Sequence, residues 1–528
     1  MLPGNFEASG ASNRSRESDM GAQKPAEGPD FAAGIAVTGL KDGCTVAGRI
    51  GDEPVLVSRR GSSYFAVGGS CTHYGGRLAD GLIEGDHAHC PLHHACFSLR
   101  TGAALAAPAF DPLPRWRVDV EDEVLFVREK LPVADPIDSN ASRHPHRIVI
   151  VGGGAAGFAA AEMLRRRGFN GALTILSADT TPPCDRPNLS KDYLAGTAPE
   201  DWIALKGDDF YRDLEIDLRL NQEALGIDRR RQEVILDGDR VRYDALLLAT
   251  GATPIRPIGE GFNLPNVYVL RSLTDARSII AATKGAHAVA VLGASFIGLE
   301  AAASLCERGL KVHVVAPEAT PLQRVLGAEI GVFIRTIHES HGVRFHLGPL
   351  AERFDGHELY LNDGSKIAVD FVVLGVGVKP NTKLASDAGL DVDNGVLVDR
   401  HMRTSDPTIY AAGDIARYFD PRTNEHIRIE HWVVAEQQGQ AAAMNILGDR
   451  RGFSATPFFW STHYDHSIHY VGHAQNWDRV ELDGKIGTEG FTARFLKGGR
   501  LLAAASLGRD RESLEIQCRM EGEAMRIR

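Results

Sequence analysis

The feature that most constrains this chain of 528 residues is a unit of strand, glycine-rich turn, helix and strand that occurs twice. Strands are predicted at 147–151, 173–176, 288–292 and 311–315. Between the strands of each pair we expect a helix, which ends at Arg167 in the first unit and at Arg308 in the second. Glycines directly after a strand allow a tight turn and let a pyrophosphate approach the helix N-terminus. Two such units indicate two dinucleotide-binding α/β domains in one chain.

The first glycine turn has the full spacing of a dinucleotide-binding loop. Gly152 permits the turn, Gly154 lets the pyrophosphate approach the backbone, and Gly157 lets the helix pack closely on the strand. Asp179 lies 22 residues after Gly157, where an acid is expected to bind a ribose hydroxyl. The strand, the helix and the acid together make this a specific signal.

The second turn is Gly293, Ser295 and Gly298, in which a serine replaces the middle glycine. Glu318 follows Gly298 by 20 residues, and neither Arg nor Lys stands beside it in the sequence. An acid at this position favours NADH over NADPH, because the 2′-phosphate of NADPH attracts a cation. The alternative for Glu318 is a solvated turn residue.

Two cysteine–histidine pairs stand on separate predicted loops, Cys71 with His73 and Cys90 with His93. Two thiolates can hold one iron of a [2Fe–2S] cluster and two imidazoles the other. A structural zinc ion is the alternative for this donor set.

The other cysteines and nearby histidines are given structural roles. We interpret the histidines as surface or packing residues, Cys96 as a small buried apolar residue and the remaining cysteines as structural. These residues are His87, His89, His94, Cys44, Cys306 and Cys518.

The segment 31–130 resembles the Rieske family in its ligand pattern and in Tyr74, Gly75, Gly76 and Cys96. Quinol-oxidising members have a disulfide between the two loops. The corresponding positions here are Gly76 and Leu92, so the resemblance implies a low-potential, ferredoxin-like centre.

The rest of the chain resembles flavoproteins that bind two dinucleotides, in particular their ferredoxin-reductase and apoptosis-inducing-factor branch. The segments that carry the resemblance are 185–191, 404–414, 431–437 and 457–461. The resemblance implies that FAD binds in the first nucleotide domain through Arg186, Gly413 and Asp414, with Trp432 at the start of a helix that points at the flavin.

The same resemblance implies Lys191 beside the flavin ring and Glu300 near the nicotinamide as catalytic residues. A cation at Lys191 would stabilise reduced flavin, although both residues could also serve as surface or helix-terminal charges. Trp460 is expected either to cover the flavin or to pack in a core.

The predicted fold is multidomain: an all-β Rieske domain, two Rossmann-like α/β domains and a small C-terminal α+β domain. The predicted order is a disordered tail at 1–30, the [2Fe–2S] domain at 31–130, a linker at 131–146, an FAD domain in two parts at 147–260 and 385–453, an NAD(P)H domain at 261–384 and a reductase domain at 454–528.

Composition excludes several partner classes. The formal net charge is −11, so a nucleic-acid partner is not expected. The longest apolar runs, such as 371–378, are far shorter than the roughly 20 residues of a membrane span. Seven cysteines, an odd number, favour a reducing, cytoplasmic setting over a disulfide scaffold. The pattern leaves a homodimer open.

These observations predict an oxidoreductase that passes electrons from NADH through FAD to the [2Fe–2S] cluster, and on to an unidentified protein or small-molecule acceptor. His73 and His93 are expected near the surface, facing outward. Two alternatives remain: an NADH-sensing interaction protein, and an NADH oxidase or disulfide reductase that uses Cys184.

Overall fold

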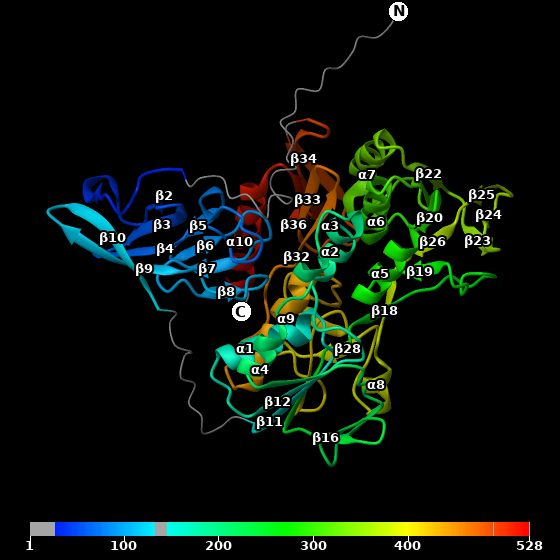
Figure 1. Ribbon diagram of the computed structural model, residues 1–528, viewed down its shortest axis with the longest axis horizontal. Helices are drawn as coiled ribbons and strands as arrows, with labels where there is room; N and C mark the ends of the chain where they lie inside the picture. Colours follow the sequence, from blue (N-terminus) through cyan, green and yellow to red (C-terminus); the bar gives the residue numbers. More distant parts are fainter. Residues whose placement is uncertain (1–26, 133–144, 489, 527–528) are drawn as a thin grey trace, which may run out of the picture.

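A computed structural model of the chain describes residues 27–132, 145–488 and 490–526 (Figure 1). The predicted tail at 1–30 and linker at 131–146 lie mostly outside the described residues. The predicted fold class is confirmed: an N-terminal β domain, two α/β units and a C-terminal α+β unit.

The N-terminal domain consists of two antiparallel sheets. The larger has the order β1-β10-β9-β4-β3-β2: Ile35–Ala36, Val124–Leu131, Arg115–Glu121, Ser63–Gly68, Glu53–Arg60 and Thr45–Ile50. The smaller has the order β5-β6-β7-β8: Leu82–Glu84, His87–His89, Cys96–Ser98 and Ala104–Ala106. The described helices of this domain are two 3-10 turns, Val37–Gly39 and Leu78–Asp80.

The first α/β unit is a five-stranded parallel sheet of order β13-β12-β11-β17-β29. Its strands are Ile216–Arg219, Ala172–Leu176, Arg147–Val151, Ala245–Leu248 and Ile409–Ala411. The last strand is contributed by the chain after it has passed through the second α/β unit. Helices α1 (Ala155–Arg166) and α9 (Trp432–Ile446) pack together beside this sheet.

The second α/β unit is also a five-stranded parallel sheet, of order β19-β26-β20-β21-β22. Its strands are Val267–Val269, Phe371–Leu374, Ala288–Leu292, Lys311–Ala316 and Arg344–Leu347, and its helices are α5 (Leu273–Ala282), α6 (Phe296–Glu307) and α7 (Gln323–Ser340). Central strands of both units are buried along almost their whole length, as parallel sheets covered on both faces require.

Short elements complete the two units. The chain passes between the units on a two-stranded ribbon of β18 (Ala252–Pro254) and β27 (Val378–Pro380). The remaining strands are β14 (Gly226–Asp228), β15 (Glu233–Ile235), β16 (Arg240–Arg242), β23 (Ala351–Phe354), β24 (Glu358–Leu361), β25 (Lys366–Ala368), β28 (Val396–Val398), β30 (Ala416–Asp420) and β31 (Glu425–Ile427). The short helices are α2 (Arg186–Leu189), α3 (Asp192–Ala195), α4 (Asp208–Asp213), α8 (Lys383–Asp387) and the 3-10 turn Glu200–Trp202.

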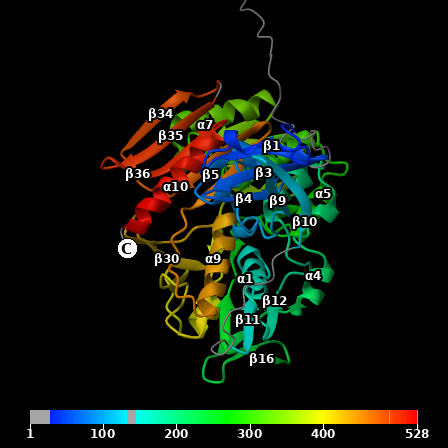
Figure 2. The same ribbon diagram turned by 90° about the vertical axis from the view of Figure 1, so that its left-hand side faces the viewer.

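The C-terminal unit is an antiparallel sheet of order β32-β33-β36-β35-β34, followed by helix α10 (Asp510–Arg526). Its strands are Phe458–His463, His466–Gly472, Arg500–Leu507, Gly490–Lys497 and Arg479–Lys485. Helix α10 lies between this sheet and the N-terminal domain, and it contacts β33, β36 and β5 (Figure 2).

The N-terminal domain is docked against the rest of the molecule through both of its neighbours. On the side of the first α/β unit, the backbone N–H of Ala107 donates to Oε1 of Gln440 at 3.2 Å, and the rings of Phe110 and Phe158 meet at 5.0 Å. On the C-terminal side, the ring of His94 stacks on Phe458 at 3.8 Å between centroids. The domain is therefore held in one place by polar and aromatic contacts.

Within the described residues, no helix combines the length and apolar character that a membrane crossing requires. The sequence analysis contained no candidate span either.

Helices α1 and α9 approach so closely that one contact admits only glycine. A Cβ atom at Gly439 would lie 2.1 Å from the carbonyl oxygen of Ala156. We expect Gly439→Ala to separate the two helices and to destabilise the protein by about 1–3 kcal/mol, the usual cost of overpacking. The measurement is the thermal midpoint Tm of the flavin-loaded protein.

Gly522→Ala is the matched control, because Gly522 is also helical and has nothing within 4 Å of the added Cβ. An equal loss of Tm in both variants would contradict the packing argument.

Candidate functional site

One large cavity joins the two α/β units and the C-terminal sheet. Its volume is about 1870 Å³, and both glycine turns line it, Gly152–Ala156 on one side and Ser295–Ile297 on the other. The chain therefore brings its two predicted dinucleotide-binding loops to a single space.

The first turn has the backbone geometry that its glycines predict. Gly152 has a φ of +113°, and a Cβ there would lie 2.2 Å from the carbonyl oxygen of Ala249. A Cβ at Gly157 would lie 1.9 Å from the carbonyl oxygen of Gly152. At Gly154, by contrast, the nearest atoms are those of the Arg186 guanidinium at 3.6 Å, which leaves room for a phosphate.

Ser295 does more in the second turn than replace a glycine. It is the N-cap of α6, and its hydroxyl accepts a hydrogen bond from the backbone N–H of Gly298 at 3.2 Å and donates one to the carbonyl of Gly375 at 2.8 Å. Gly293 has a φ of +103°, and a Cβ there would meet the carbonyl oxygen of Gly375 at 2.4 Å. The serine thus fixes the start of the helix that faces the cavity.

Two ion pairs stand at the cavity wall, one within the first unit and one between the two units. Asp179 accepts a hydrogen bond from Arg186 at 3.2 Å. Asp414, which is buried, pairs with Arg271 at 2.5 Å. Each arginine therefore offers its remaining N–H groups to the cavity, next to the first glycine turn.

Gly413 and Trp432 are placed beside these pairs. The backbone N–H of Gly413 donates to Oε1 of the buried Gln438 at 2.9 Å, and Gly413 has a φ of +82°. Trp432 is the first residue of α9 and lines the cavity. The N-terminus of this helix therefore lies at the cavity, where its partial positive charge favours an anion.

Four residues that line the cavity have a buried polar atom with no hydrogen-bond partner among the described residues. These atoms are Nε of Arg271, Nε of Arg428, Nδ1 of His431 and Nε2 of His473. Buried polar groups are normally paired, so their position suits a polar ligand in the cavity. Together with the space at Gly154, these atoms fit a bound dinucleotide such as FAD.

Lys191 and Glu300 form a buried ion pair at the junction of the units. Nζ of Lys191 lies 2.9 Å from Oε2 of Glu300, and the two side chains are 14% and 5% exposed. The hydroxyls of Ser190 and Ser461 each donate to the Glu300 carboxylate at 2.6 Å. Both predicted catalytic residues line the cavity, held by one another and by two hydroxyls.

Glu318 has a cation beside it in space, although none is adjacent to it in the sequence. Nη2 of Arg324 lies 3.1 Å from Oε1 of Glu318, and both residues line the cavity. Arg324 comes six residues later and reaches back from the first turn of α7. No cation stands next to Glu318 in the sequence, but the fold brings Arg324 beside it, so the site holds a carboxylate and a guanidinium side by side.

The two cysteine–histidine pairs come together in the N-terminal domain. Nδ1 of His73 lies 3.2 Å from Nδ1 of His93. The pKa of the Cys71 thiol is lowered by a hydrogen bond from Cys90, and that bond, together with burial, raises the pKa of Cys90. Two sulfur and two nitrogen donors thus converge from two loops, which fits a [2Fe–2S] cluster of mixed ligation.

Gly76 is required beside this donor set. A Cβ there would lie 2.9 Å from Sγ of Cys90 and 3.0 Å from Cδ1 of Leu92. Gly76 and Leu92 are thus neighbours in space. These are the two positions that the resemblance to the Rieske family aligns with the disulfide of its quinol-oxidising members.

His93 faces the rest of the molecule and not the solvent. It is 2% exposed, and its ring packs on Trp460 of β32 at 4.0 Å between centroids. Trp460 also lines the cavity, and the centroid of its ring lies 5.8 Å from Nζ of Lys191. The expectation that both histidines face outward is therefore wrong for His93, and His73 is half-buried.

Cys184 does not have the surroundings of a reactive thiol. It is 9% exposed and packs in the core shared by the second α/β unit and the C-terminal sheet. Burial raises its pKa. Reactive cysteines have a lowered pKa, so this environment argues against the oxidase alternative.

Sequence reasoning missed Arg271, Arg324, Ser190 and Ser461. Each acts through a partner that is distant in the chain or separated by a turn, so no local pattern marks it. From the sequence, Trp460 is expected either to cover the flavin or to pack in a core. Its contact with His93 depends on domain docking, which no local sequence pattern encodes.

Comparison with known proteins covers almost the whole chain. Family models match at 146–439 (pyridine nucleotide-disulphide oxidoreductase), 34–117 (Rieske [2Fe-2S] domain) and 458–523 (reductase C-terminal). The chain is 31% identical to human apoptosis-inducing factor 3 over 499 residues, which covers 91% of this chain and 82% of that protein.

Ferredoxin reductases are similar to the part after the N-terminal domain. The ferredoxin–NAD(+) reductase component of the anthranilate 1,2-dioxygenase system from Burkholderia cepacia is 38% identical over 69% of this chain and 91% of its own length. Among solved structures, the covalent putidaredoxin reductase–putidaredoxin complex matches with a TM-score of 0.69 at 33% identity, over 72% of this chain and 94% of that chain.

Replacement of Glu318 tests the nucleotide preference. We expect Glu318→Ala to release Arg324, so that its guanidinium can bind a 2′-phosphate. The ratio of kcat/KM for NADPH to kcat/KM for NADH should then rise about fivefold, which corresponds to roughly 1 kcal/mol for an exposed ion pair. The measurement is steady-state reduction of an artificial acceptor with each nucleotide. The double variant Glu318→Ala/Arg324→Ala is the control, and an equal shift there would contradict a role for Arg324.

Proposed function

The chain belongs to the pyridine nucleotide-disulphide oxidoreductase family and is an FAD-dependent NAD(P)H oxidoreductase with a Rieske [2Fe–2S] domain, and from this premise we propose that it delivers electrons from NADH through FAD to its own cluster and then to a separate acceptor. Flavin accepts a hydride from a nicotinamide and can release electrons singly, which suits a one-electron iron–sulfur centre.

The observation that carries the proposal is the contact between His93 and Trp460. One side of the indole packs on His93, and Trp460 also belongs to the cavity wall beside Lys191. The proposed cluster ligand and the proposed flavin site therefore meet at one side chain. A docked cluster domain needs no diffusion step between the two centres.

Residues of the chain are assigned as follows. FAD is held by the first glycine turn with Gly152, Gly154 and Gly157, and by Asp179, Arg186, Gly413, Asp414 and Trp432. NADH is held by Gly293, Ser295, Gly298 and Glu318, and the cluster by Cys71, His73, Cys90 and His93.

Lys191 and Glu300 are assigned to the flavin side of the cavity. Nζ of Lys191 is fixed by the Glu300 carboxylate at 2.9 Å and lies close to Trp460. A fixed ammonium group at this place stabilises negative charge in the cavity. Ser190 and Ser461 hold the carboxylate, so Glu300 keeps the ammonium group in position.

The role of Trp460 is tested by stopped-flow reduction with NADH, observed at flavin and at cluster wavelengths. We expect Trp460→Leu to slow cluster reduction by at least about tenfold, or 1.36 kcal/mol of barrier, and to leave flavin reduction unchanged. Trp460→Phe keeps an aromatic ring and is expected to lose less.

Trp202→Phe is the matched control, because Trp202 is 44% exposed and lies outside the site. A His73→Ala variant identifies the cluster signal. Cluster reduction in Trp460→Leu at the wild-type rate would contradict the proposed route. A long-lived reduced flavin with no cluster reduction in the wild type would instead favour the NADH-sensing alternative.

Replacement of Cys184 tests the remaining alternative. Since its thiol is buried and its pKa is raised, we expect Cys184→Ser to retain NADH-dependent reduction of the cluster. The measurement is the same stopped-flow trace. Loss of NADH turnover with retention of bound FAD would make this cysteine the reaction centre.

A further inference from the structure

A second group of metal-binding side chains lies in the N-terminal domain, around His89. Its ligand atoms form two overlapping triads, His87 with His89 and Cys96, and His89 with Glu84 and Cys518. Within each triad, the ligand atoms lie within 4.8 Å of one another. None of these side chains belongs to the cluster or to the cavity described above.

Strand register explains how three strands present these side chains on one face. His89 is paired with Cys96 across β6 and β7, and Glu84 with His87 across β5 and β6. Paired residues, and residues two apart in a strand, share a face of the sheet. The intervening Ala88 is fully buried in the core on the opposite face.

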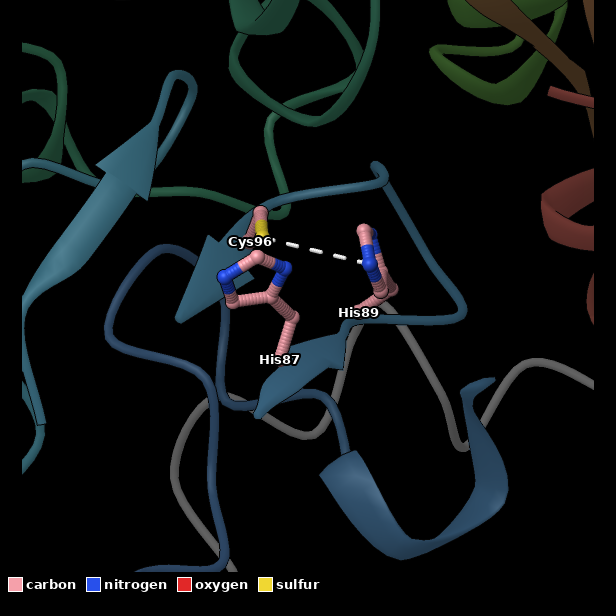
Figure 3. A group of neighbouring side chains, drawn as sticks. All are labelled: His87, His89 and Cys96. Atoms are coloured by element: carbon pink, nitrogen blue, oxygen red, sulfur yellow. Dashed lines mark hydrogen bonds between the residues drawn. The ribbon is translucent and has the colours of Figure 1, made fainter. Parts of the chain in front are cut away.

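Three of these side chains can be followed in Figure 3, where His87 and His89 project from β6 on the same side of the sheet as Cys96 on β7. Sγ of Cys96 lies 3.9 Å from Nε2 of His89. Cys90 is the residue after His89 and points to the other face, where it meets Cys71. The group is therefore distinct from the cluster ligands, although it adjoins them in the sequence.

The fifth side chain comes from the other end of the chain. Cys518 lies on α10, which contacts β5. It forms a hydrogen bond with Glu84, and its Sγ lies within 4.8 Å of the ligand atom of His89. A thiol from the C-terminal domain thus meets an imidazole of the N-terminal domain across their interface.

We propose that this group is a structural zinc site that joins the N-terminal β domain to helix α10. Glu84, His89 and Cys518, which form one triad, supply an oxygen, a nitrogen and a sulfur ligand. Cys96, whose Sγ lies 3.9 Å from Nε2 of His89, supplies the fourth ligand once its side chain moves toward Cys518. Zinc is the ion that this donor set favours, since thiolate and imidazole ligands with one carboxylate are typical of tetrahedral Zn²⁺ sites, whereas Mg²⁺ and Ca²⁺ require several oxygen ligands.

Access and position support the assignment. Glu84 and His87 are exposed, so an ion can enter from solvent, while His89, Cys96 and Cys518 are half-buried and hold it at the domain boundary. Apart from Glu84, the residues of this group are ones that the sequence analysis interprets as structural or surface residues. It would fix the same docking that presses His93 against Trp460.

The test is elemental analysis and zinc K-edge X-ray absorption of the flavin- and cluster-loaded protein after incubation with Zn²⁺ and gel filtration. We expect about one zinc ion per chain with sulfur neighbours at about 2.3 Å. Cys96→Ser and Cys518→Ser are each expected to weaken zinc retention by at least about tenfold. Iron and flavin contents, measured on the same samples, show whether each variant has folded.

Two controls separate this site from other thiols. Cys44→Ser removes an exposed cysteine of the same domain and is expected to keep the zinc. Cys71→Ser removes a proposed cluster ligand and is expected to lose iron but to keep zinc. Since a ligand variant could also unfold, alkylation of the wild-type protein provides a second readout: zinc is expected to protect Cys96 and Cys518 but not Cys44.

Four outcomes would overturn the proposal. They are the absence of zinc, zinc with only oxygen and nitrogen neighbours, zinc whose loss follows Cys71 instead of Cys96 and Cys518, and a disulfide between Cys96 and Cys518 in the isolated protein.

Discussion

The packing of the loop after β6 against strand β32 is the interaction on which the arrangement of this molecule depends. Two consecutive histidines face the C-terminal sheet, His93 on Trp460 and His94 on Phe458. Neighbouring residues in an extended chain would point to opposite sides, but His94 has a φ of +60°. This left-handed conformation costs a non-glycine residue roughly 1–2 kcal/mol, and the ring stacking offsets that cost. Without the turn, only one of the two rings would reach the reductase.

Buried ion pairs line the cavity that Trp460 borders on the side away from His93. Lys191 with Glu300, and Arg271 with Asp414, are ion pairs that lie in the wall of a cavity between three units. Burying an ion pair contributes little net stability, because desolvation offsets much of the attraction. Their value lies in position. The Glu300 carboxylate, for example, is held by two hydroxyls and cannot reorient when a ligand enters, so the field of its pair with Lys191 is preorganised.

The sequence predicts what depends on local pattern and fails where the partner is distant. Strands at 147–151 and 288–292 are confirmed because continuous apolar runs bounded by glycine leave few alternatives. The burial of His93 was not predictable, since it depends on a tryptophan that lies 367 residues later in the chain. The cation beside Glu318 comes from the next helix, and the thiol beside His89 comes from α10, so neither has a spacing that a motif could record.

The docked position of the N-terminal domain determines which of its two proposed histidine ligands an electron acceptor can reach. With His93 covered by Trp460, the half-buried His73, stacked on Tyr74, is the more accessible of the two imidazoles. On the proposed route, electrons then enter the cluster on the side of His93 and leave it on the side of His73, so the cluster is reduced while the domain stays docked. An acceptor that needs both imidazoles must instead wait for the domain to undock. The contacts of Ala107 and His94 with the reductase decide between these two regimes, because their strength sets the fraction of time for which His93 is covered.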